Sequence, residues 1–223
     1  MHKTIIILAG GKSRRFHSFD KCFATLDNKL LMHHAIDTLS GPADEIIVAA
    51  RDEQQGEQIR AKVPDRIILV FDSLKGLGPL AGFIAGLERA SFAYSFVIGC
   101  DMPFVNERVV DWLFEIASTG YDAVVPRWEN GMLEPLHAVY RKEPMLAAIK
   151  EAAKQGDAKI SYVISQLKDV CFLPVNQIRE IDPRLETFTN INTPEALKKN
   201  GNDFFIPAHI MKPNDYSYNS SNT

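Results

Sequence analysis

The segment LAGGKSRRFHSFDK at residues 8–21 has the residue types of a phosphate-binding loop, because two adjacent glycines follow an apolar run. Gly10 and Gly11 allow close approach of the backbone to a ligand, and successive N–H groups in such a turn can bind an anion. Positive charge around that anion would come from four side chains: Lys12, Arg14, Arg15 and Lys21. The combination indicates a site for nucleotide phosphates, and the alternative is a glycine-rich turn with solvated basic residues.

The spelling of this segment differs from two common phosphate loops. Gly11-Lys12-Ser13 matches the end of a Walker A motif, but Ile6 stands where that motif requires its first glycine. The GxGxxG pattern of dinucleotide-binding loops is also missing from the sequence of this segment. The segment therefore predicts a phosphate site of a third kind.

Two aspartates follow other apolar runs. Asp101 lies in GCDMPF, where its carboxylate would stand at the end of a strand. Mg²⁺ prefers oxygen ligands and commonly bridges one or two carboxylates to substrate phosphates, so Asp101 is the candidate metal ligand. Asp72 begins DSLKGLGPLAG and could accept hydrogen bonds from the ring N–H and amino group of guanine. For each aspartate the alternative is a structural role in a turn.

The second half of the chain offers further candidates. Glu134 and His137 lie in residues 133–140, which we expect to be extended, and both could face a second substrate. A lone histidine is more often structural than a ligand. Cys22 and Cys100 flank the predicted site in sequence, but the odd total of three cysteines without a CxxC pattern indicates reduced, buried thiols.

The hydrophobic pattern predicts the elements that position these residues. Apolar runs of strand length, without alternation, indicate strands buried on both faces, at residues 4–8, 45–50, 66–71, 95–99 and 122–126. Helical patterns follow at residues 30–39, 53–63, 79–90 and 106–117. This order predicts a three-layer, Rossmann-like α/β fold with a mostly parallel sheet. Parallel strands end at one edge, so the loops after them should converge on a single cleft.

The rest of the chain is less regular. Residues 143–154, 160–167 and 194–199 have helical patterns, and residues 170–173 and 187–191 resemble strands. We expect this half to add a smaller antiparallel part to the sheet. One domain should cover residues 1–200, followed by a tail at residues 201–223 that is expected to be partly disordered.

Composition narrows the class of protein. The net charge of −3 and the 46% hydrophobic content are those of an ordinary globular chain, and they argue against a general nucleic-acid binder. The apolar run at residues 5–9 is too short for a signal sequence or a membrane span. We therefore expect a cytoplasmic protein that has neither nucleic acid nor a membrane as its partner.

Five motifs together resemble the molybdenum cofactor guanylyltransferases of the MobA type. The first loop is similar to the family pattern LAGGxSxRMGxxDK, and the segments DS and GPLAG at residues 72–73 and 78–82 are similar to its DS…GPLAG. CDMP at residues 100–103, PLHAVY at 135–140 and FTNINTPEAL at 188–197 resemble three further family motifs. The resemblance spans about residues 4–198.

The resemblance implies an Mg²⁺-dependent nucleotidyltransferase that moves GMP from GTP to molybdopterin and releases pyrophosphate. It implies nucleotide contacts from residues of the motifs: Leu8, Ala9, Gly10, Lys21, Asp72 and Asp101. Gly11 is a further nucleotide-binding candidate from its place in the glycine loop. Asp101 would also hold the metal, and Arg15 and Lys21 would stabilise the departing pyrophosphate. Asn190 and Asn192 become candidates for the pterin side, and transient contacts with proteins that make or receive the cofactor are expected.

Two departures from the family pattern leave alternatives open. Phe16-His17 replaces Met-Gly in the loop, and Arg51 stands where the family has an asparagine after its second strand. The first alternative is transfer from CTP or another nucleotide, either to the pterin or to a sugar or alditol phosphate. Enzymes of the latter kind commonly read LAAGxGxR, whereas this chain has LAGGKSRR. The second alternative is a nucleotide-binding module without catalysis, which the presence of Lys21 and Asp101 disfavours.

Overall fold

The computed structural model describes residues 1–10, 20–71, 79–155, 159–191 and 204–205. The strands of its large sheet are β1 (Thr4–Leu8), β4 (Glu45–Ala50), β5 (Ile68–Phe71), β6 (Tyr94–Gly99), β7 (Ala123–Arg127), β8 (His137–Arg141) and β9 (Val170–Pro174). Among the described residues these seven strands pair in the order β5-β4-β1-β6-β8-β7-β9.

The central strands are parallel and buried on both faces. β1 lies between β4 and β6, with Ile6 opposite both Ile47 and Val97. β8 pairs antiparallel with both β6 and β7, while β7 and β9 are parallel to each other. As a result, β1, β4, β6, β7 and β9 all end at the same edge of the sheet, which is the edge where α/β folds bind their ligands.

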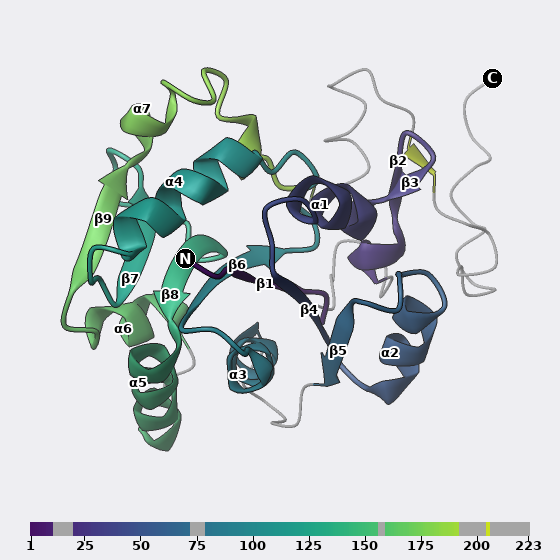
Figure 1. Ribbon diagram of the computed structural model, residues 1–223, viewed down its shortest axis with the longest axis horizontal. Coiled ribbons are helices and arrows are strands. Elements are labelled where there is room, and N and C mark those ends of the chain that lie inside the picture. The colour runs from purple at the N-terminus through teal and green to yellow at the C-terminus, as the bar shows by residue number, and fades with distance from the viewer. Residues whose placement is uncertain (11–19, 72–78, 156–158, 192–203, 206–223) are drawn as a thin grey trace, which may run out of the picture.

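Helices cover both faces of this sheet and make the three layers visible in Figure 1. The described helices are α1 (Leu31–Leu39), α2 (Glu53–Arg60), α3 (Pro79–Arg89), α4 (Glu107–Ala117), α5 (Lys142–Lys154), α6 (Ile160–Ser165) and α7 (Val175–Ile178). Apolar residues of α1, α2, α4 and α7 join one core cluster, and those of α3, α5 and α6 join the other. Residues that alternate along β1 contribute to the two clusters in turn, which explains its unbroken apolar sequence.

A small antiparallel sheet lies beside the main one. It consists of β2 (Thr25–Leu26), β3 (Lys29–Leu30) and β10 (Phe204–Phe205), in the order β10-β2-β3. The β2–β3 connection is a two-residue turn in which Asp27 and Asn28 have φ of 51° and 61°. Asparagine and aspartate tolerate this left-handed region better than most residues, and a tight hairpin requires it at both positions.

The predicted fold class is confirmed, since a large, mostly parallel sheet carries helices on both faces and antiparallel strands accompany it. The predicted strand at residues 187–191 is wrong. The chain there forms a 3₁₀ turn, η3 (Glu186–Phe188), after Leu185 takes a left-handed conformation with φ of 54°. The predicted helix at residues 194–199 lies outside the described residues. No helix among those described has the length and apolarity needed to cross a bilayer.

Candidate active site

Lys21 and Asp101 meet at the carboxyl edge of the sheet. Lys21 begins the 3₁₀ turn η2 (Lys21–Phe23), and Asp101 follows the end of β6 by two residues. Lys21 Nζ lies 3.1 Å from Asp101 Oδ2, and the two side chains keep 16% and 19% of their surface exposed. Such partial burial strengthens the pairing while leaving both groups accessible to a charged ligand.

The carboxylate of Asp101 folds back over the end of its own strand. A β-carbon on Gly99 would lie 2.5 Å from Asp101 Oδ1, so this carboxylate position requires glycine two residues earlier. The main chain around Asp101 is also fixed, because Ile191 N donates to Asp101 O at 2.8 Å and Cys100 N donates to Leu8 O at 3.1 Å. The strand end therefore presents an anchored anion.

The end of β1 lies between β6 and β4. Ala9 N donates to Ala49 O at 2.9 Å, and Ala9 O accepts from Gln55 Nε2 at 3.1 Å. The side chains of Leu8 and Ala9 are almost fully buried. Any contact that these two residues make with a nucleotide must therefore come mainly from the backbone, as the glycine-rich sequence suggests.

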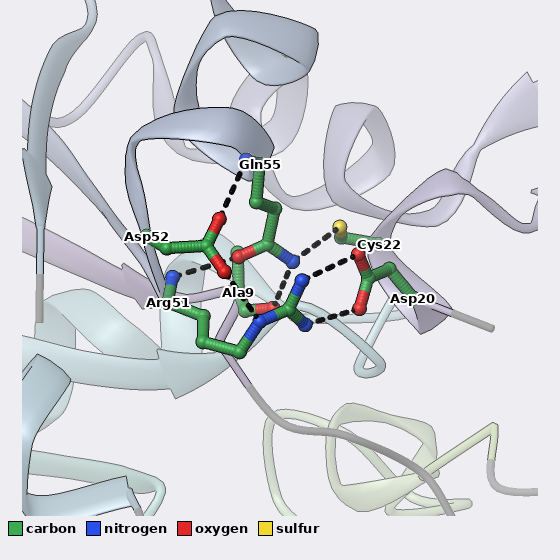
Figure 2. Close-up of polar contacts among 6 residues, drawn as sticks. All are labelled: Ala9, Asp20, Cys22, Arg51, Asp52 and Gln55. Atoms are coloured by element: carbon green, nitrogen blue, oxygen red, sulfur yellow. Dashed lines mark hydrogen bonds and ion pairs between the residues drawn. The ribbon is translucent and has the colours of Figure 1, made fainter. Parts of the chain in front are cut away.

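Arg51 turns its side chain toward two carboxylates, as Figure 2 shows. Its NH1 and NH2 groups donate to Asp20 Oδ1 and Oδ2 at 2.5 and 3.2 Å, and its Nε donates to Asp52 Oδ2 at 2.9 Å. The hydrogen bond to Asp20 is the main cause that raises the pKa of Arg51 above its ordinary value. The arginine that departs from the family pattern thus has its charge balanced within the protein.

Sequence reasoning missed Asp20, Asp52 and Gln55 as parts of this site. Asp52 caps α2, since its Oδ1 accepts from Gln55 N at 2.8 Å. The spacing Asp52-x-x-Gln55 is a capping signature that the sequence displays, so this helix start was recognisable. The ion pair between Arg51 and Asp20 has no comparable signal, because it joins positions 31 residues apart.

The cysteines behave as expected for buried thiols. Cys22 and Cys100 are buried and unpaired by any disulfide, while Cys171 is half-buried. Hydrogen bonding with Cys22, followed by burial, raises the pKa of Cys100. A raised pKa disfavours the thiolate, so Cys100 is a poor nucleophile at neutral pH.

Glu134 lies in the turn between β7 and β8, beside Trp128. Trp128 Nε1 donates to Glu134 Oε1 at 2.6 Å, and burial raises the pKa of this carboxyl against the opposing effect of that bond. Trp128 also lines a cavity of about 330 Å³ at the ends of β7 and β9, together with Arg127, Glu129, Gly131, Pro174, Val175 and Asn176. This cavity opens at the same edge of the sheet as Asp101.

His137 occupies a different environment from the one we expected. Its side chain is fully buried, its Nε2 is 3.1 Å from Thr187 Oγ1, and its ring contacts Phe96 and Phe188 edge-on. Burial lowers the pKa of His137 to about 3, so the imidazole is neutral at pH 7. The ring exposes no atom to a ligand in this conformation, and direct contact with an acceptor is therefore not supported.

Other predicted site residues can be placed only in part. Asn190 is exposed beside Ile191, which bonds to Asp101, and thus lies on the side of the site nearer β6. Gly11, Arg15, Asp72 and Asn192 lie outside the described residues. Within the described part of the chain, no group of three or more His, Cys, Asp or Glu residues could hold a metal by itself. Asp101 fits a hard divalent cation only if other oxygens, such as nucleotide phosphates, complete the coordination.

The fold is of the α/β class that binds ligands at the carboxyl edge of its sheet, and its charged side chains gather at that edge. The chain belongs to the family described as the MobA-like NTP transferase domain, whose model matches residues 5–170. It is 44% identical over 200 residues to a "Probable molybdenum cofactor guanylyltransferase" of Methanosarcina mazei and 42% identical over 201 residues to one of Methanosarcina acetivorans, each with 88% of both chains covered.

A solved structure agrees with this assignment. The "Molybdopterin-guanine dinucleotide biosynthesis protein A" from Archaeoglobus fulgidus is 32% identical to this chain and superposes with a TM-score of 0.76. The match covers 88% of this chain and 95% of the other. The family resemblance that the motifs indicated is therefore confirmed over most of the described structure.

Proposed function

We propose that this protein transfers GMP from GTP to molybdopterin, forming the guanine dinucleotide cofactor and releasing pyrophosphate. The names of its relatives support the reaction. The observation that carries the proposal for the site is the 3.1 Å contact between Lys21 and Asp101, which places a cation and an anion side by side at the ligand-binding edge.

The reaction needs alignment more than acid–base chemistry. A terminal phosphate oxygen of the acceptor attacks the α-phosphorus of GTP, a new P–O bond forms, and the bond from that phosphorus to the bridging oxygen of pyrophosphate breaks. The attacking oxygen is already anionic, so no strong general base is required. Lys21, joined by Arg15, stabilises the charge that builds on the leaving pyrophosphate.

Asp101 is the residue that would hold Mg²⁺. When bound, this ion supplies charge neutralisation at the phosphate oxygens. Asp101 contributes an anchored carboxylate whose direction is set by Gly99 and by the backbone bond from Ile191. Leu8, Ala9, Gly10 and Gly11 bind the nucleotide in this proposal, and Asp72 reads its base.

The acceptor side of the proposal lies toward β7 and β9. Trp128 contacts Phe188 edge-on at 5.7 Å, and residues 186–191 lead from there to Asp101. The cavity is lined by Trp128, whose Nε1 donates to Glu134, and we propose that it receives a flat heterocycle against the indole ring. Asn190 and Asn192 remain candidates for contact with the acceptor in this proposal. A cytoplasmic location and transient contact with other proteins of cofactor synthesis or insertion remain predictions.

The test is a transfer assay with GTP labelled at the α-phosphate, molybdenum-loaded molybdopterin and Mg²⁺. The proposal requires label in a pterin dinucleotide and one pyrophosphate per transfer, with CTP a poor substitute. Preferential use of CTP would support the alternative nucleotide, and transfer to a sugar or alditol phosphate would support the alternative acceptor. Binding of GTP without turnover would support the non-catalytic module.

The same assay tests Asp101. Asp101→Asn should lower the rate by roughly 10²-fold or more, because a metal ligand is lost with little change in shape. Asp111→Asn is the matched control, since Asp111 also pairs with a lysine, Lys3, but on α4 away from the strand ends. Equal rates for Asp101→Asn and the parent would contradict the assignment.

A further inference from the structure

Four residues form what we call the β4–α2 bracket: Asp20, Arg51, Asp52 and Gln55. The bracket joins the start of η2 to the junction between β4 and α2 (Figure 2). We propose that Arg51 and Gln55 are positioning residues that hold Lys21 in place for catalysis, Arg51 through Asp20 and Gln55 through Cys22. This inference rests on the proposed function for the role of Lys21 but concerns residues that the reaction itself does not use.

The guanidinium of Arg51 is occupied on all three of its nitrogens. Two of them donate to Asp20 in a bidentate pair, and the third donates to Asp52. The side chains of Arg51 and Asp20 keep 25% and 15% of their surface exposed, so the pair is shielded from much of the solvent. A bidentate arginine–carboxylate pair fixes direction as well as distance, which suits a positioning role better than phosphate binding.

Gln55 supplies the second contact of the bracket. Its side chain is 1% exposed, which is unusual for glutamine and requires that its polar atoms be bonded. Its Nε2 donates to Ala9 O at 3.1 Å and to Cys22 Sγ at 3.6 Å, and its Oε1 accepts from Arg51 N at 2.7 Å. A single buried amide thus ties β1, η2 and β4 together.

The consequence for Lys21 follows from its neighbours in the chain. Asp20, directly before it, is held by Arg51, and Cys22, directly after it, is held by Gln55. Both anchors belong to the same β4–α2 junction, so the backbone of Lys21 is fixed on its two sides. The fixed backbone keeps Lys21 Nζ at 3.1 Å from Asp101 Oδ2, and no contact with a ligand is needed for this.

The bracket also suggests what Arg51 does in place of the family asparagine. Its charge is already satisfied by Asp20 and Asp52, so it adds no unpaired cation beside Gly10, against which its backbone packs. If Arg51 instead bound the nucleotide directly, its removal would weaken GTP binding whether or not Lys21 were present. Positioning and direct binding therefore predict different kinetics.

The experiment combines Arg51→Met with Lys21→Ala in a double-mutant cycle. In the parent background, Arg51→Met should lower kcat by about 10-fold with little change in KM for GTP, because misplacement of Lys21 affects the transition state. In the Lys21→Ala background the same substitution should change kcat by less than about twofold, since the residue it positions is gone. Lys150→Met, which breaks an exposed pair with Glu88, is the matched control and should leave both kinetic constants unchanged.

Hydrogen exchange gives a readout that does not depend on turnover. Arg51→Met should increase the exchange rate of the amides of Phe23 and Ala24, which bond to Asp20 O and Lys21 O, while those of β6 stay protected. If the parent protein does not transfer GMP, the proposed function is wrong, but hydrogen exchange still tests whether the bracket holds η2. Should Arg51→Met not fold, Asp20→Asn replaces it, with a smaller loss of kcat that is also suppressed by Lys21→Ala.

Three results would overturn the inference. The first is an unchanged kcat in folded Arg51→Met or Asp20→Asn. The second is an equal loss with and without Lys21, which would show that Arg51 acts on the substrate or on the fold as a whole. The third is unaltered exchange at Phe23 and Ala24, which would show that the bracket does not hold η2.

Discussion

Two regions at the same edge of the sheet differ in whether their polar side chains are charged and exposed or neutral and buried. Around Lys21, Asp101, Arg51 and Asp20, every side chain is paired with an opposite charge and remains partly exposed. Around His137 and Thr187, the polar atoms are fully buried and the imidazole is neutral at pH 7. The sequence predicted binding residues in both regions, Lys21 and Asp101 in the first and His137 in the second. The structure places the first two at a partly exposed, charged surface and His137 in the core.

The difference indicates that the two regions have different roles, one structural and one chemical. Thr187 Oγ1 accepts from Asn106 N at the start of α4 and contacts His137 Nε2, which fixes residues 186–191 from behind. Ile191 of that segment donates to Asp101 O. The neutral region therefore supports the backbone of the charged one, and we expect its substitutions to change stability more than chemistry.

The largest effect should come from the charged region. Lys21→Ala should lower kcat by about 10²-fold, as does the loss of one group that stabilises transition-state charge. Its melting temperature should change little, because a partly exposed ion pair contributes modestly to folding. Steady-state kinetics and a thermal melt give both quantities, and Lys29→Ala is the control, since Lys29 pairs with exposed Asp37. A kcat for Lys21→Ala equal to that of the parent would contradict the catalytic role of the charged region.

The neutral region should respond to pH instead. His137 has a folded pKa of about 3, below its unfolded value of about 6.5, so the unfolded chain binds the extra proton between these values. The free energy of unfolding should then fall as pH drops below about 6.5, by up to roughly 1.4 kcal/mol per pH unit. His137→Phe removes this contribution. The difference in the free energy of unfolding between this variant and the parent, measured in urea, should therefore shrink as the pH is lowered from 7 to 5. Parallel pH profiles for the two proteins would show that His137 is not held neutral by burial.

The smallest effect should come from Glu134, which is titratable like the charged region but partly buried. Burial raises its folded pKa above the unfolded value, so its ionised form destabilises the fold as pH rises through that folded pKa. Glu134→Gln keeps an oxygen for Trp128 Nε1 and should raise the melting temperature slightly at pH 7.5 but not at pH 4. Scanning calorimetry at the two pH values measures this. An increase of KM for molybdopterin in the same variant would support the predicted acceptor role, and an unchanged KM would count against it.

The sheet and the meeting of Lys21 with Asp101 were predictable because they depend on backbone geometry. Unbroken apolar runs at residues 4–8 and 95–99 indicated buried strands, and parallel strands of one sheet end at the same edge. The loop after the first strand and the residue after the fourth were therefore expected at one edge, whereas the direct pairing of these two strands was not predicted. The comparison with relatives confirms this architecture over 88% of the chain.

The bracket and the buried histidine were not predictable in the same way. Whether Arg51 turns to Asp20 or to a ligand depends on side-chain rotamers, and a glutamine in a helix gives no sign that it will be buried. Residues 187–191 contain Thr, Phe and Ile, which favour strands, but a strand needs a hydrogen-bonding partner. The left-handed backbone at Leu185 instead turns that segment toward Asp101.

The most direct test of the account is a crystal structure of the protein with GTP and Mg²⁺. We expect the metal at about 2.1 Å from an oxygen of Asp101, with Lys21 Nζ moved from that carboxylate to a phosphate oxygen and Arg51 still paired with Asp20. Phosphates bound in the cavity beside Trp128, with Lys21 still paired to Asp101, would contradict it.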